Sequence, residues 1–157
     1  MELHPGDLAD PARLIQEIAE ECALVTGTAH LAVVADPSTY QRLTHVETLP
    51  TPAVIGHYLQ VQDLIGDTLR EKLPIPEWQG KGPRHTVVTV IVREGFTVFG
   101  RNEEQWLLGW RYSKHLMEAF SGTTFLVTEH GWYDWQSRWG DRHPRSVPRQ
   151  ASLVPVT

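Results

Sequence analysis

The stretch that decides the fold is HTVVTVIV, residues 85–92. Valine and isoleucine occur on both faces of its two-residue repeat, which is typical of a strand buried on both sides. We therefore expect this segment in the interior of a sheet, with helices packed on one or both faces of that sheet.

The sequence before this strand predicts three helices and one further strand. Asp10-Pro11 opens the first helix, because Asp is a good N-cap and Pro suits the first helical position. A second Asp-Pro pair at 36–37 predicts a short helix in the same way. Apolar residues at helical spacing predict a long third helix. These elements lie at 11–26 (helix), 30–35 (strand), 38–46 (helix) and 53–73 (helix).

The sequence after the central strand predicts a hairpin, a helix and a last strand. A turn at 93–95 returns the chain as a strand at 96–99. Asn102 with Gln105 forms a predicted N-cap box for a helix that runs to about Phe120. A strand follows at 123–128, and the segment 129–141 is aromatic and irregular.

Together these elements predict an α+β fold with the order αβααββαβ. The sheet is mixed and has about four strands, with helices on one or both faces. We expect one domain over residues 1–143. The proline-rich, basic tail at 144–157 has little periodicity, so we expect it to be extended or disordered.

The composition places the chain among ordinary globular domains. It has 157 residues, of which 41% are hydrophobic and 21% charged. Cys22 is the only cysteine, so no intrachain disulfide can form. The N-terminus lacks the features of a secretory signal, and no apolar run approaches the roughly 20 residues that cross a bilayer. These observations predict a cytoplasmic protein that does not insert into membranes.

The charge is divided unevenly along the chain. Residues 136–157 hold four arginines and one aspartate, a charge of +3, which leaves −8 for the rest of a chain with net charge −5. An acidic body repels a phosphate backbone, so nucleic acid is disfavoured as a partner. The basic tail is free to contact an acidic protein, nucleic acid or the body itself.

Aromatic residues gather late in the chain. Four of them fall within eight residues, with arginines beside them, and three of the tryptophans have the spacing of one helical face. This composition is typical of interface hot spots. The alternative is a core lid that covers the sheet and the Trp106–Trp110 helix face. The predicted binding surface consists of Trp132, Tyr133, Trp135, Arg138, Trp139 and Arg142.

A second set of residues suggests metal chemistry. Glu129, His130 and Asp134 follow the last predicted strand, and Asp36 follows the first. If those two strands were parallel neighbours, these side chains would converge and hold a divalent metal for phosphoester hydrolysis. The other explanation is structural: Asp36 serves as a helix N-cap, and Glu129-His130-Gly131 as a strand-end turn.

From the sequence we expect a small cytoplasmic, non-catalytic binding or regulatory module. Its aromatic, arginine-flanked C-terminal surface would contact a protein partner or a second copy of the chain. The alternative is a metal-dependent hydrolase or nuclease that uses Asp36, Glu129, His130 and Asp134. A third hypothesis is a binder of single-stranded nucleic acid whose aromatic residues stack on bases, which the acidic body disfavours. The sequence contains no zinc-protease, P-loop, serine-hydrolase or EF-hand signature.

Overall fold

The computed structural model describes residues 3–73, 83–113 and 119–149. Within these ranges the chain forms three helices and one six-stranded mixed sheet, in the order αββαβαβββ. In chain order the elements are α1 (Pro11–Glu21), β1 (Ala29–Ala35), β2 (Arg42–Thr48), α2 (Leu59–Glu71), β3 (His85–Val92), α3 (Arg101–Tyr112), β4 (Ala119–Thr128), β5 (Gly131–Asp134) and β6 (Gly140–Asp141).

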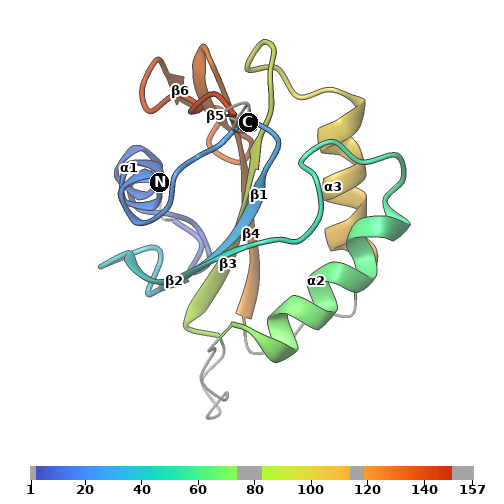
Figure 1. Cartoon of the computed structure of the whole chain (residues 1–157). Coiled ribbons are helices and arrows are strands. Elements are labelled where there is room, and N and C mark those ends of the chain that lie inside the picture. Colours follow the sequence, from blue (N-terminus) through green and yellow to red (C-terminus); the bar gives the residue numbers. More distant parts are fainter. Residues whose placement is uncertain (1–2, 74–82, 114–118, 150–157) are drawn as a thin grey trace, which may run out of the picture.

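The strands lie side by side in the order β2-β1-β3-β4-β5-β6 (Figure 1). β3 and β4 run parallel, and the other neighbouring pairs run antiparallel. β3 has a strand on each side, and all of its residues after His85 are buried. The prediction of an interior strand with both faces covered is confirmed.

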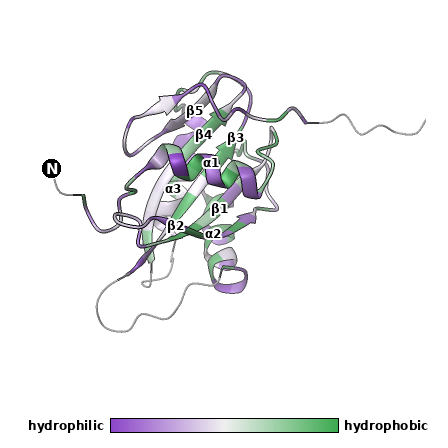
Figure 2. Cartoon of the chain, turned by 90° about the vertical axis from the view of Figure 1, so that its left-hand side faces the viewer, coloured by the Kyte–Doolittle hydropathy of each residue, from purple (hydrophilic) through white to green (hydrophobic). Residues whose placement is uncertain are grey.

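Helices cover both faces of the sheet. α2 and α3 pack on one face, and α1 packs on the other (Figure 1). Figure 2, seen from the side of α1, shows the apolar strands that this helix covers. The core of the α1 layer includes Leu14, Ile15 and Ile18, whereas Ile65 and Trp106 contribute to the core of the α2–α3 layer. Among the described residues, no helix is both long enough and apolar enough to span a membrane.

The helix expected at 38–46 is a strand instead. Asp36 and Gln41 have φ angles of 46° and 47°, so the chain leaves β1 through a turn in left-handed conformation. It then returns as β2, antiparallel to β1. The β-branched Thr44 and Val46 favour this strand. The Asp-Pro pair was therefore misleading, because it begins a turn here.

The long helix expected at 53–73 begins only at Leu59. The preceding loop is fixed by two side chains of α3. Asn102 Oδ1 accepts the Ile55 N–H at 2.9 Å, and Gln105 Oε1 accepts the Tyr58 N–H at 2.9 Å. The predicted N-cap box of Asn102 and Gln105 is thus wrong. α3 begins after Gly100, whose N–H donates to Glu103 Oε1 at 2.9 Å.

Two further segments differ from the prediction. Residues 96–99 form a loop instead of a strand, because no other strand within the described ranges pairs with their backbone groups. Residues 129–141 were expected to be irregular, but they form β5 and β6, which extend the sheet from about four strands to six.

The last helix has other limits than expected. α3 ends at Tyr112, and Phe120, the expected helix end, lies in β4; the intervening residues 114–118 lie outside the described ranges. In the tail, Val147 forms a parallel bridge with Val25, and its N–H donates to Leu24 O at 2.7 Å. Residues 150–157 of the predicted tail lie outside the described ranges.

Candidate functional site

The structure does not bring Asp36 and Glu129 together. β1 and β4 are separated by β3 and run in opposite directions. The register pairs Ala35 with His85 and His85 with Ala119. Asp36, which follows β1, therefore lies level with the start of β4, two strands away. Glu129 lies beyond its end. The nine residue steps along β4 correspond to about 30 Å. The condition on which the hydrolase hypothesis depended, parallel neighbouring strands, is not met.

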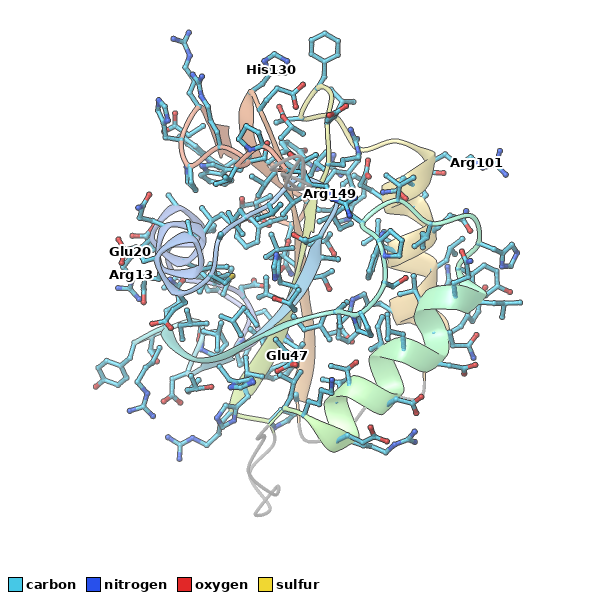
Figure 3. All side chains as sticks on the ribbon, viewed as in Figure 1. Arg13, Glu20, Glu47, Arg101, His130 and Arg149 are labelled. Atoms are coloured by element: carbon cyan, nitrogen blue, oxygen red, sulfur yellow. The ribbon has the colours of Figure 1, made fainter. Side chains whose placement is uncertain are left out.

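Glu129 and His130 do lie close together, and His130 lies at the end of the sheet (Figure 3). Glu129 Oε1 is 3.6 Å from His130 Nε2, and both side chains are exposed. The Glu129 carboxylate accepts the Gly95 N–H at 3.1 Å. Hydrogen bonds from its own backbone amide and from Gly95 lower the pKa of Glu129. The His130 ring stacks on Phe96 at 5.5 Å. The pair therefore supports the loop that follows β3.

Asp134, the fourth residue of the predicted metal set, has a structural role. Its side chain is buried and accepts hydrogen bonds from Thr123 Oγ1 and from the Ser137 N–H and Oγ, the last two at 3.2 and 2.5 Å. These bonds fix the turn after β5. Across the three described ranges, no three His, Cys, Asp or Glu side chains form a group suited to a metal ion.

The predicted aromatic surface divides between the two faces of the sheet. The segment is a strand pair and not a helix, so neighbouring side chains point to opposite faces. Trp132 is 3% exposed, packs beside Phe125 and donates from Nε1 to His143 O at 2.8 Å. It belongs to the core of the α1 layer. Trp135 and Trp139 are 37% and 72% exposed.

On the α2–α3 side, aromatic rings from two segments stack together. Phe99, from the loop after β3, lies 4.8 Å from the Trp135 ring with an angle of 15° between the planes. Phe99 also contacts Tyr133 edge-on at 5.6 Å and packs against the core of the α2–α3 layer. The Arg138 guanidinium lies over Trp135, 5.1 Å from the ring centroid. Of the predicted set, the structure brings Tyr133, Trp135 and Arg138 together around the Phe99–Trp135 stack.

The loop after β3 adds residues that sequence reasoning missed. Phe96 and Val98 are 75% and 68% exposed. The sequence signal for these two residues is their two-residue spacing after the turn at Gly95. That spacing also predicts a strand, which is how residues 96–99 are interpreted from the sequence alone. We define the aromatic surface by six residues: Phe96, Val98, Phe99, Tyr133, Trp135 and Arg138.

A buried ion pair holds this loop in place. Arg93 Nη2 and Nε lie 2.6 and 2.9 Å from the two oxygens of Glu103, whose side chain is fully buried. Arg93 also donates to Glu94 O at 2.9 Å and Val98 O at 3.0 Å. Burial alone would raise the pKa of Glu103, but hydrogen bonds from Arg93, Gly100 and Asn102 lower it. The hydrogen bond to Glu103 raises the pKa of Arg93.

The other face of β5 carries a cleft of about 310 Å³ between the β5–β6 hairpin and the start of α1. Trp139 lines this cleft. Arg142 is the remaining residue of the predicted surface; its side chain is exposed, and it follows Asp141, which lines the cleft. The residues that line the cleft are Ala9, Asp10, Pro11, Ala12, Trp132, Ser137, Trp139, Gly140 and Asp141.

Comparisons with known proteins do not assign the chain to a family. No family model matches it, and no curated protein and no solved structure matches it.

Proposed function

We propose that this chain is a binding module that recognises a protein partner, or a second copy of itself, through the aromatic surface. The observation that carries the proposal is the exposure of Phe96 and Val98, at 75% and 68%, on a loop fixed by the buried Arg93–Glu103 pair. The sequence alone suggests such a module with a partly different set of residues, which shares Tyr133, Trp135 and Arg138 with the aromatic surface.

The energetics favour recognition over a purely structural role. Phe96 and Val98 bury little surface within their own fold, and each would contribute about 1.5–3 kcal/mol if a partner covered it fully. Because Arg93 already holds the loop, association would cost little conformational entropy there. Trp135 with Arg138 beside it adds the residue types that dominate binding energy at interfaces.

The hydrolase hypothesis has no comparable support. Its residues are distributed between the two ends of the sheet, and Asp134 is occupied by Thr123 and Ser137. Nothing in the aromatic surface resembles a base-stacking groove with arginines along its length, since Arg138 is the one cation in the set that defines it.

The test compares a double variant of the aromatic surface with a control variant that replaces an exposed aromatic residue elsewhere on the protein. Phe96→Ser/Val98→Ser removes the apolar tips, whereas Tyr40→Ser removes an 82% exposed ring at the opposite end of the sheet. Self-association is measured by sedimentation velocity, and capture from an extract of the source cells by affinity purification. We expect the double variant to weaken the association by about 100-fold or more, from two lost side chains. Tyr40→Ser should behave as the parent.

The proposal would be contradicted if the parent were monomeric and captured the same proteins as the double variant. Circular dichroism of the three proteins provides the folding control, because all three substitutions replace exposed side chains that the core does not need.

A further inference from the structure

The cleft between α1 and the β5–β6 hairpin has the size of a site for one side chain. Its volume of about 310 Å³ lies at the lower end of the range of roughly 300–1,000 Å³ found for small-ligand sites. It lies on the opposite face of β5 from the aromatic surface, so a ligand in the cleft is independent of the proposed recognition of a partner through that surface.

The walls of the cleft are largely apolar. Pro11 and Ala12 line it from the first turn of α1, and the buried Trp132 lines it from β5. Trp139 also lines it and keeps 72% of its surface exposed. An exposed indole beside an apolar wall suits the stem of a long side chain together with a cation that packs on the ring.

Two carboxylates add negative charge to this cleft. Asp10 Oδ1 accepts the Arg13 N–H at 3.1 Å, and Asp141 Oδ1 accepts the Arg142 N–H at 2.6 Å. Among the described residues, neither carboxylate forms an ion pair with a cationic side chain. The hydrogen bonds of the two carboxylates engage one oxygen of each, Oδ1.

Arg13 and Arg138 are engaged elsewhere, whereas Arg142, next to Asp141 in the chain, is exposed and forms no ion pair with Asp10 or Asp141. Arg13 donates to Glu17 Oε1 and to the carbonyls of Tyr40 and Gln41, and Arg138 lies over Trp135. The amino end of α1 contributes about half a positive charge. The carboxylates of Asp10 and Asp141 each carry a full negative charge that no ion pair of the described residues neutralises, and this favours a cationic ligand.

We propose that this cleft binds the arginine side chain of a polypeptide. The guanidinium plane stacks on the Trp139 indole and donates to the carboxylates of Asp10 and Asp141, while the alkyl stem lies along Pro11 and Ala12. Arginine fits better than lysine, because a planar guanidinium combines ring stacking with forked donation to carboxylates.

The test is a titration with N-acetyl-arginine-N-methylamide, followed through the indole N–H signals of the tryptophans by NMR. The signal of Trp139, assigned with Trp139→Phe, should shift in a saturable way with a dissociation constant on the order of 1 mM. The neutral isostere N-acetyl-citrulline-N-methylamide should produce no saturable shift. N-acetyl-lysine-N-methylamide should bind several-fold more weakly.

Two conservative variants test the carboxylates. Asn caps helices as well as Asp does, so Asp10→Asn keeps the start of α1, and Asp141→Asn keeps the acceptor for Arg142 N–H. Each should weaken binding about three-fold, and the pair about ten-fold. Glu20→Gln, an equal loss of charge on α1 (Glu20 is labelled in Figure 3), should leave binding unchanged.

Three outcomes would overturn this proposal. These are an unshifted Trp139 signal, equal binding of the citrulline compound, and equal weakening by Glu20→Gln, which would reveal only a long-range charge effect. A far-ultraviolet circular dichroism spectrum of Asp10→Asn that equals the spectrum of the parent shows that a loss of binding does not reflect a lost helix.

Discussion

The rings of Phe99 and Trp135 lie 4.8 Å apart with 15° between their planes, although one belongs to the loop after β3 and the other follows β5. This stack joins the loop to the sheet edge. It helps to explain how Phe96 and Val98 remain exposed on a loop that is nevertheless fixed.

Replacing Phe99 should therefore destabilise the fold, whereas replacing Phe96 should not. Phe99→Ala loses its contacts with Trp135 and Tyr133 and should cost about 1–3 kcal/mol of unfolding free energy. Phe96→Ala removes a 75% exposed ring and should cost under about 0.5 kcal/mol. Urea unfolding of both variants checks this. Equal costs would show that the Phe99 stack contributes nothing to stability.

The buried pair of Arg93 and Glu103 should be costly to break from one side. Glu103→Gln keeps an acceptor for the Gly100 N–H but leaves the Arg93 charge uncompensated, and should cost about 3 kcal/mol. The double variant Arg93→Met/Glu103→Leu removes both charges and should recover a large part of that loss. Thermal unfolding with matched urea titrations measures the three proteins. A double variant less stable than Glu103→Gln would contradict the role given to the unpaired charge.

Two glycines should respond in opposite directions to Ala. Gly131 has φ 129°, and a Cβ added there would overlap the carbonyl oxygen of Asp141, so Gly131→Ala should separate β5 from β6 and destabilise the hairpin. A Cβ on Gly66, inside α2, meets nothing within 4 Å, and Gly66→Ala should stabilise by about 0.5–1 kcal/mol. The midpoints of thermal unfolding should move down and up respectively. A stabilising Gly131→Ala would contradict the hairpin geometry.

Acid should destabilise the protein through His30. This side chain is 2% exposed and bonds to Thr28 and Thr48 at 2.9 and 3.0 Å, and burial lowers its pKa to about 4. The unfolded chain, with a His pKa of about 6.5, binds the proton more readily. Stability contributed by neutral His30 is therefore complete above pH 6.5 and is lost as the pH falls toward 4, by about 3 kcal/mol.

The matched variant for this prediction is His30→Gln, which can still bond to both threonines but does not titrate. The difference in unfolding free energy between parent and variant should change between about pH 6.5 and about pH 4 and stay constant above that window. A difference independent of pH would contradict the assignment to His30, since the lowered pKa of His85 acts equally in both proteins.

Strong local patterns could be interpreted correctly from the sequence, and competing ones could not. HTVVTVIV is apolar on both faces, and only a central strand accommodates that pattern, so β3 was predicted correctly. Asp36-Pro37 and Asp10-Pro11 look alike, yet only Asp10-Pro11 opens a helix. The difference is the pairing of β2 with β1, which is a long-range contact.

The candidate site shows the same limit. The sequence left open whether the tryptophans are exposed or core. Trp135 and Trp139 are exposed, whereas Trp132 is core, because alternation along β5 turns it to the α1 layer. The contribution of Phe96, Val98 and Phe99 depends on the buried pair of Arg93 and Glu103, which no local pattern reveals. Convergence of Asp36 with Glu129 depended on strand direction, which the sequence does not specify.

The most direct measurement of the central claim is site-specific photo-crosslinking in the source cells. A benzophenone side chain at position 98 lies within the aromatic surface, and one at position 40 replaces a similarly exposed residue at the other end of the sheet. We predict a discrete crosslinked species, with a partner or with a second copy, from position 98 and none from position 40. The same products from both positions, or none from position 98, would contradict recognition through the aromatic surface.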